Sequence, residues 1–189
     1  MGFPKRYAEL AARTRVPAGF LVAVLFLALA RPSWPSLAMG GGVALLGMAL
    51  RAWAAGHLAK YQKLSTSGPF AHLRNPLYAG TMIVGLGFAI SGARIGIGVL
   101  LVLFFALFYL PVIEEEERYL RSRFPDFAEY EKRVPRFWPK LRAQHANGAP
   151  FRFALYRQNR EYQALAGFLL VMALLAVKRL YLGGALGGP

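Results

Sequence analysis

The chain has 189 residues, of which 56% are hydrophobic, and it contains no cysteine. The lack of cysteine excludes disulfides, thiolate nucleophiles and Cys-ligated metals. A formal net charge of +14 could indicate nucleic acid, but the basic residues are concentrated between apolar blocks and form no recognisable nucleic-acid-binding motif, so no nucleic-acid partner is expected.

Five apolar segments predict membrane-spanning helices, because their hydrophobic residues form blocks rather than a single helical stripe. These segments are residues 16–30, 37–59, 77–91, 95–113 and 164–182. Only the stretch "SGAR" joins the third segment to the fourth, which predicts a tight helical hairpin. The expected fold is an all-α polytopic membrane protein. Its single domain, 1–189, has a core at 37–140 and a C-terminal extension with an extra membrane helix at 150–182.

Lysine and arginine lie at alternate ends of these segments. They precede the first segment, separate the second from the third, and recur eleven times between residues 118 and 160. The opposite connections hold only Arg31 and Arg94. By the positive-inside rule, this predicts a cytosolic N-terminus and cytosolic basic segments, with the bacterial inner membrane as the expected location. The N-terminal stretch has no clear cleavage site, so its removal as a signal peptide is not expected.

The stretch "GPFAHLRNPLYAG", residues 68–80, leads into the third apolar segment. Pro76 suits the first position of a helix, and the Asn75 side chain can cap that helix. This pattern is equally typical of a well-made helix start and of an anion site. In the second case the free N–H groups of the helix and the Arg74 guanidinium would bind a carboxylate, with Tyr78 in the first turn.

Four consecutive glutamates, Glu114 to Glu117, follow directly on the fourth apolar segment. They are either a solvated helix turn neutralised by nearby arginines, or carboxylates that hold a cationic or hydroxyl-rich ligand. Amphipathic spacing over residues 120–134 then predicts a short helical segment on the membrane surface or folded over the mouth as a lid. Together, the two stretches would suit a zwitterionic amino-acid moiety that carries a ribose.

These two stretches, "GPFAHLRNPLYAG" and "EE…F…Y…VPRFWP", together resemble the integral-membrane methyltransferases over residues 51–140. That group comprises isoprenylcysteine carboxyl methyltransferases, phospholipid N-methyltransferases and bacterial relatives, and Asn75 is more like the phospholipid and bacterial branch. The resemblance implies S-adenosylmethionine as methyl donor, S-adenosylhomocysteine as product, and a lipophilic acceptor from the bilayer. It assigns cofactor contacts to Arg74, Asn75, Pro76, Tyr78, Glu116, Glu117 and Tyr130.

Other residues are candidates with two interpretations each. Gly85 and Gly87 could bring the cofactor close to a helix or simply pack helices together. Arg51, a charge inside the second apolar segment, could orient a carboxylate acceptor or reach the interface. An amine acceptor would need a base, such as His72, a glutamate or water. Arg51, His72 and Glu116 are therefore the candidate catalytic residues, and the scattered histidines predict no metal site.

Two other functions are compatible with this pattern. A membrane reductase resembling the steroid reductases would bind NADPH, with a basic cluster at Arg118, Arg121 and Arg123 for its phosphate, although the adjacent glutamates argue against this. A non-enzymatic lipid-binding or scaffolding protein would bind neither cofactor. The expected partner is a membrane lipid or a lipophilic small molecule, and the fifth apolar segment is also a candidate homodimer contact.

Overall fold

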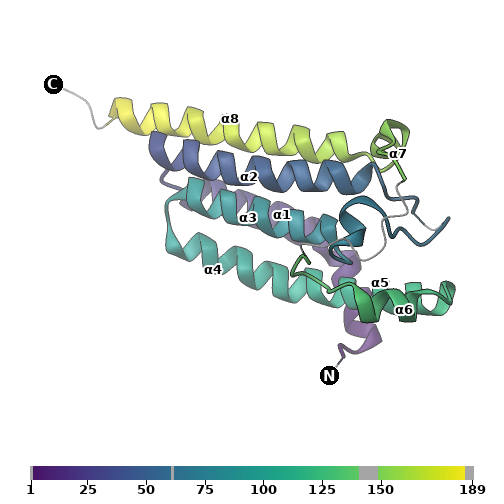
Figure 1. Ribbon diagram of the computed structural model, residues 1–189. Coiled ribbons are helices and arrows are strands. Elements are labelled where there is room, and N and C mark those ends of the chain that lie inside the picture. The colour runs from purple at the N-terminus through teal and green to yellow at the C-terminus, as the bar shows by residue number, and fades with distance from the viewer. Residues whose placement is uncertain (1, 61, 141–148, 186–189) are drawn as a thin grey trace.

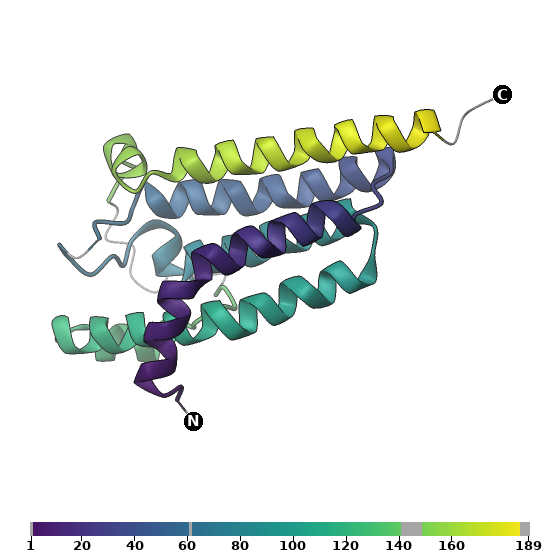
Figure 2. The same ribbon diagram turned by 180° about the vertical axis from the view of Figure 1, so that it is seen from behind.

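The structure is a computed structural model that describes residues 2–60, 62–140 and 149–185, and this part of the chain is helical without strands (Figures 1 and 2). The helices, in chain order, are α1 (Lys5–Leu29), α2 (Trp34–Ala55), η1 (Gly68–Ala71), α3 (Pro76–Gly92), α4 (Ile95–Phe104), η2 (Phe105–Tyr109), α5 (Leu110–Arg123), α6 (Phe127–Arg133), α7 (Phe153–Gln158) and α8 (Glu161–Ala185). The predicted all-α fold and the α3–α4 hairpin are confirmed.

In the described part of the chain, four stretches are long and apolar enough to cross a membrane: Lys5–Leu29, Trp34–Ala55, Ile95–Arg123 and Glu161–Leu182. The fifth predicted span, α3, has 17 residues. At 1.5 Å per residue it covers about 26 Å, against a hydrocarbon core of about 30 Å. Figure 1 shows α8, α2, α3 and α4 side by side, and Figure 2 shows α1 lying across α3 and α4. The chain is thus an integral membrane protein.

The closest helix pair is α2 with α3, and glycine makes that approach feasible. A Cβ at Gly87 would lie 2.5 Å from the carbonyl oxygen of Gly40, and a Cβ at Gly47 would lie 2.7 Å from that of Gly80. Small residues at such contacts let helix backbones pack closely in a membrane. Gly87 therefore serves this helix contact, whereas a Cβ at Gly85 would meet nothing within 4 Å. This arrangement favours packing over the predicted cofactor contact for Gly87.

These two glycines give a prediction with an internal control. Gly87→Val should destabilise the protein by about 1–3 kcal/mol, because α2 and α3 must separate to admit the side chain. Gly85→Ala, two residues away on the same helix, should cost less than about 0.5 kcal/mol. Reversible unfolding of the detergent-solubilised variants would measure both. Equal effects would contradict the close helix contact.

Three predicted boundaries differ most from the structure. The first helix begins at Lys5 rather than Val16, because Lys, Arg, Ala and Leu are all good helix formers and charge does not stop a helix. The second ends at Ala55 rather than Ala59, since Gly56 closes it. The fourth continues past Ile113 to Arg123 as α5. It contains η2, a single π-helical turn, which is a feature common at functional sites.

One end of the bundle gathers the segments rich in arginine and lysine. Figure 1 shows the N-terminus, η1's segment, α5 with α6, and α7 at the same end, with the α1–α2 and α3–α4 connections at the other. At that opposite end, the Arg31 amide donates to the Gly92 carbonyl at 2.9 Å. The alternation of basic residues along the sequence therefore becomes a separation between the two ends of the molecule.

Candidate functional site

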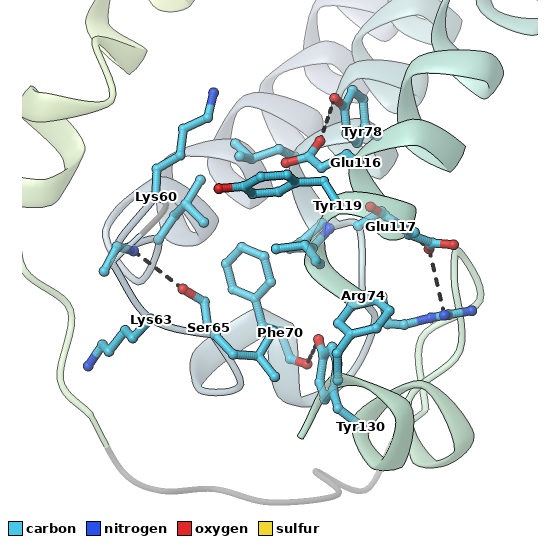
Figure 3. A pocket seen from close by; sticks show the side chains of 18 residues that line it. Lys60, Lys63, Ser65, Phe70, Arg74, Tyr78, Glu116, Glu117, Tyr119 and Tyr130 are labelled. Carbon is cyan, nitrogen blue, oxygen red and sulfur yellow. Dashed lines mark hydrogen bonds and ion pairs between the residues drawn. The ribbon is translucent and has the colours of Figure 1, made fainter. Parts of the chain in front are cut away.

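A pocket lies at the basic end of the bundle, with its lining side chains shown in Figure 3. Its walls come from four places: the segment after α2, η1, the start of α3, and the facing surfaces of α5 and α6. Residues from both stretches singled out in the sequence line it. The structure thus brings together side chains that lie about 40 residues apart in the chain.

Glu117 is the most buried carboxylate in this pocket, with a side chain only 3% exposed. It accepts a hydrogen bond from Asn75 Nδ2 at 2.9 Å and is paired with Arg136, while Arg74 Nη1 lies 3.7 Å from its Oε1. The hydrogen bonds to Glu117 also raise the pKa of the Arg136 guanidinium. These partners neutralise Glu117, so its main effect is to fix the residues around it.

Asn75 differs from expectation in one respect. It occupies the N-cap position of α3, and its carbonyl accepts from the Ala79 amide at 3.0 Å, but its side chain makes no capping hydrogen bond. The prediction that this side chain caps α3 was wrong. Its side-chain N–H donates to the Glu117 carboxylate, and because hydrogen bonds to charged groups are stronger than neutral ones, this contact sets the orientation of the side chain.

Arg74 is held by α6 on one side and leaves one donor unused. Its Nη1 donates to Glu131 Oε1 at 2.7 Å, and Glu131 is also bound by Arg121. Burial would raise the pKa of Glu131, but these hydrogen bonds outweigh burial and hold that pKa below its ordinary value. Arg74 Nε is buried and has no hydrogen-bond partner among the described residues. A buried donor of this kind is available to an anionic ligand.

Glu116 and Tyr78 form the second polar pair of the pocket. The Tyr78 hydroxyl donates to Glu116 Oε2 at 2.9 Å, as Figure 3 shows, and the Tyr78 ring packs edge-on against Tyr109 with centroids 6.0 Å apart. Arg15 of α1 also interacts with the Tyr78 hydroxyl. Glu116 has far fewer protein partners than Glu117, so it is the carboxylate better placed to accept from a ligand.

The amphipathic segment after α5 folds over the pocket. The Tyr130 hydroxyl of α6 donates to the Phe70 carbonyl of η1 at 2.7 Å, and burial raises the pKa of Tyr130. Phe127 is 1% exposed and Val134 is 3% exposed. Of the two predicted placements, the structure shows the segment as a cover on η1 and the start of α3.

The predicted site residues divide into two groups. The pocket is lined by Arg74, Asn75, Pro76, Tyr78, Glu116, Glu117 and Tyr130, and not by Arg51, His72, Gly85 or Gly87. Arg51 instead pairs with Glu161 at 2.5 Å, and His72 Nδ1 lies 2.7 Å from the Lys140 carbonyl oxygen. Among residues 2–60, 62–140 and 149–185, no three His, Asp or Glu side chains gather as metal ligands.

Sequence reasoning missed Arg136, Glu131, Lys60 and Tyr119. Arg136 stands inside "VPRFWP", so the motif itself could have drawn attention to it as the partner of a buried glutamate. Lys60 and Tyr119 line the pocket on opposite walls. Neither has a local signal, because their closeness depends on how the segment after α2 folds back toward α5.

A family match covers most of the residues that line the pocket, but not Phe127 and Tyr130. The model of the family described as "Phospholipid methyltransferase" matches residues 37–126. The cobalt-zinc-cadmium resistance protein CzcN of Cupriavidus metallidurans is 40% identical over 103 residues, covering 51% of this chain and 48% of that protein. The nickel-cobalt-cadmium resistance protein NccN of Alcaligenes xylosoxydans xylosoxydans is 34% identical over 105 residues, covering 52% and 49%. The chain thus spans about half the length of these relatives. No solved structure matches it.

Proposed function

The match over residues 37–126 relates this chain to the integral-membrane methyltransferases, and from that premise we propose that it transfers a methyl group from S-adenosylmethionine to a lipophilic acceptor. One observation carries the proposal. The start of α3 and the glutamates of α5, both inside the matched segment, converge on one pocket. That pocket combines buried acidic, basic and aromatic side chains.

The residues of the pocket fit the two charges of the amino-acid part of this cofactor. Arg74 Nε is a buried donor without a hydrogen-bond partner in the described part of the chain, and leaving such a group unsatisfied costs about 1–3 kcal/mol. A ligand carboxylate would satisfy it. Glu116 would accept hydrogen bonds from the ligand's ammonium or ribose hydroxyls, while Tyr78 holds its other oxygen. Phe70 and Tyr119 offer aromatic surface to an adenine ring.

The pocket must widen to admit the whole cofactor. Its cavity measures about 70 Å³, whereas small-molecule sites typically measure about 300–1,000 Å³. The wall formed by residues 63–65 belongs to no helix. We therefore expect this wall, rather than α3 or α5, to move when a ligand enters.

When bound, S-adenosylmethionine supplies a methyl group already activated by a sulfonium, so the protein has to align the reactants and exclude water. Phe70 and Phe127 are buried and would keep water away from the reacting groups. An amine acceptor must lose a proton. Glu116 lines the pocket and His72 does not, so the proton would pass to Glu116 or to water.

The acceptor and the orientation are inferred from the membrane setting. The pocket lies at the start of α3, an apolar helix, so a lipid-like acceptor can reach it from the bilayer. The basic residues gather at the same end, and the positive-inside rule would place that end in the cytosol. The names of the two relatives refer to metal resistance and specify no acceptor. The acceptor is thus proposed as an isoprenylcysteine-like carboxylate or a phospholipid-like amine.

Calorimetric titration of the detergent-purified protein tests the proposal. We expect saturable binding of S-adenosylhomocysteine and no binding of NADPH in parallel. Binding of NADPH alone would favour a reductase of the steroid-reductase type. Binding of neither ligand by a folded sample would contradict both enzymes and favour a lipid-binding membrane protein.

A further inference from the structure

The helices α7 and α8 lie beyond the segment that matches the family, yet a short stretch between them contacts both sides of the pocket. This stretch runs from Asn159 to Glu161. Figure 1 shows it at the pocket end of the bundle, beside the end of α2. The side chains of Asn159 and Glu161 contact different partners, and each of these partners adjoins residues that line the pocket.

Asn159 holds the segment that follows α2. Its Nδ2 donates to the Ala55 carbonyl at 3.0 Å and to the Leu58 carbonyl at 2.9 Å. Leu58 and the two residues after it line the pocket. One amide group thus satisfies the carbonyl at the end of a helix and that of the first wall residue, which fixes where this wall leaves α2.

The same wall is tied a second time by residues just before α7. The Arg152 amide donates to the Gly56 carbonyl at 2.9 Å. The Phe151 ring lies so close to Gly56 that a Cβ there would be 2.1 Å from it. The exit of the chain from α2 is therefore enclosed by the C-terminal segment on two sides, which leaves little freedom for Leu58.

Glu161 acts on the opposite wall through Arg51. Its carboxylate oxygens lie 2.5 Å from Arg51 Nε and 3.1 Å from Nη2, and its side chain is 6% exposed. Arg51 Nη1 in turn donates to Thr81 Oγ1 at 2.5 Å and reaches the Leu77 carbonyl at 3.5 Å. Leu77 lines the pocket and precedes Tyr78. The ion pair thus supports the first turn of α3 from the side away from the pocket.

The backbone at Arg160, between Asn159 and Glu161, is strained. Arg160 has φ +54°, in the left-handed region that favours glycine. Such a conformation persists where the surrounding contacts determine it. Here the contacts of Asn159 with α2 and of Glu161 with Arg51 require the turn. The strain is an independent sign that both contacts are made at once.

We infer that Asn159 and Glu161 are positioning residues for the proposed cofactor site, holding the Leu58 wall and the first turn of α3 at a fixed separation. The C-terminal extension is then part of the site and not only an additional membrane anchor. The inference rests on the proposed function for the identity of the ligand. The positioning itself depends only on the contacts described.

The test compares Asn159→Ala and Glu161→Gln with the control Arg160→Gly. The control keeps the Asn159 and Glu161 side chains and places at the positive φ a residue that adopts it readily. Hydrogen exchange of the detergent-solubilised protein would follow the backbone amides around residues 57–60 and 77–81. We expect Asn159→Ala to speed exchange in the first region and Glu161→Gln in the second. Each should weaken binding of S-adenosylhomocysteine about tenfold, because the wall that it holds is no longer fixed for the ligand. Arg160→Gly should change neither measurement.

Local exchange separates positioning from general packing. A purely structural role would speed exchange throughout the bundle and lower the unfolding midpoint without a regional pattern, and this result would overturn the inference. Unchanged local exchange in both folded variants would also overturn it. If Glu161→Gln does not fold, Glu161→Asp keeps the charge and should give a smaller change confined to residues 77–81. If the parent protein binds no S-adenosylhomocysteine, the proposed function fails, while the exchange measurement still decides the positioning.

Discussion

Replacement of Glu117 by alanine is expected to destabilise the protein by about 3 kcal/mol, a large share of the 5–15 kcal/mol that typically separates folded from unfolded protein. The Glu117 side chain is 3% exposed and binds Asn75 and Arg136. Its loss leaves the buried Asn75 amide and the nearby Arg74 guanidinium, 11% exposed, without this carboxylate, whereas Arg136 is 40% exposed and can be solvated. Unfolding with denaturant in detergent would measure the change in the free energy of unfolding.

Glu115→Ala is the matched control for this variant. Glu115 lies two residues earlier on the same helix, is 35% exposed, and pairs with Arg118 at 3.4 Å. A surface ion pair of this kind contributes less than about 1 kcal/mol. If both substitutions cost the same, Glu117 is not the buried centre that the structure describes.

The second large effect is expected from Glu116→Gln, which should weaken binding of S-adenosylhomocysteine about tenfold to a hundredfold and leave stability nearly unchanged. Glutamine can still accept the hydrogen bond from Tyr78, so the fold keeps its contact. It loses the negative charge that we propose binds the ligand's ammonium. Hydrogen bonds to charged groups contribute about 1.5–3 kcal/mol. Calorimetric titration would measure the change in affinity.

Glu115→Gln is the control, because this substitution removes the same charge from the same helix. Glu115 does not line the pocket. The variant should bind S-adenosylhomocysteine as the parent protein does. Equal weakening by both variants would mean that the affinity depends on net charge rather than on contact with Glu116. Unaltered affinity in Glu116→Gln would remove Glu116 from the proposed site.

These two predictions assign different roles to Glu116 and Glu117, which sequence pattern alone does not distinguish. Sequence reasoning brought "RNPLY" and the paired glutamates Glu116 and Glu117 together through a resemblance, and in the structure these residues line one pocket. Local pattern could also locate the apolar helices and the α3–α4 hairpin, because hydrophobic blocks and a short connection suffice for that. It could not assign different roles to Glu116 and Glu117, since their partners come from other parts of the chain.

Partners far apart in sequence explain the other differences. The Arg51–Glu161 pair joins residues 110 positions apart, and no periodicity connects them. The Asn75 side chain was expected to serve its own helix because that choice is local, whereas its actual acceptor is 42 residues away. A single sequence gives spacing within an element, but contacts between elements depend on how the helices pack.

The π-helical turn at Phe105–Tyr109 determines which glutamates can face the pocket. Each residue of an α-helix rotates the next side chain by about 100°, so a turn that takes up one extra residue changes the angular phase of everything after it. In the phase observed, Glu116 and Glu117 line the pocket, while Arg118 points to the N-terminal residues and donates to the Phe3 carbonyl. If these residues formed an ordinary α-helical turn instead, every later side chain would move one place along the helix, and Glu116 would take the place that Glu117 now holds. The selection among four identical neighbours is thus made by helix geometry several residues upstream, inside the membrane.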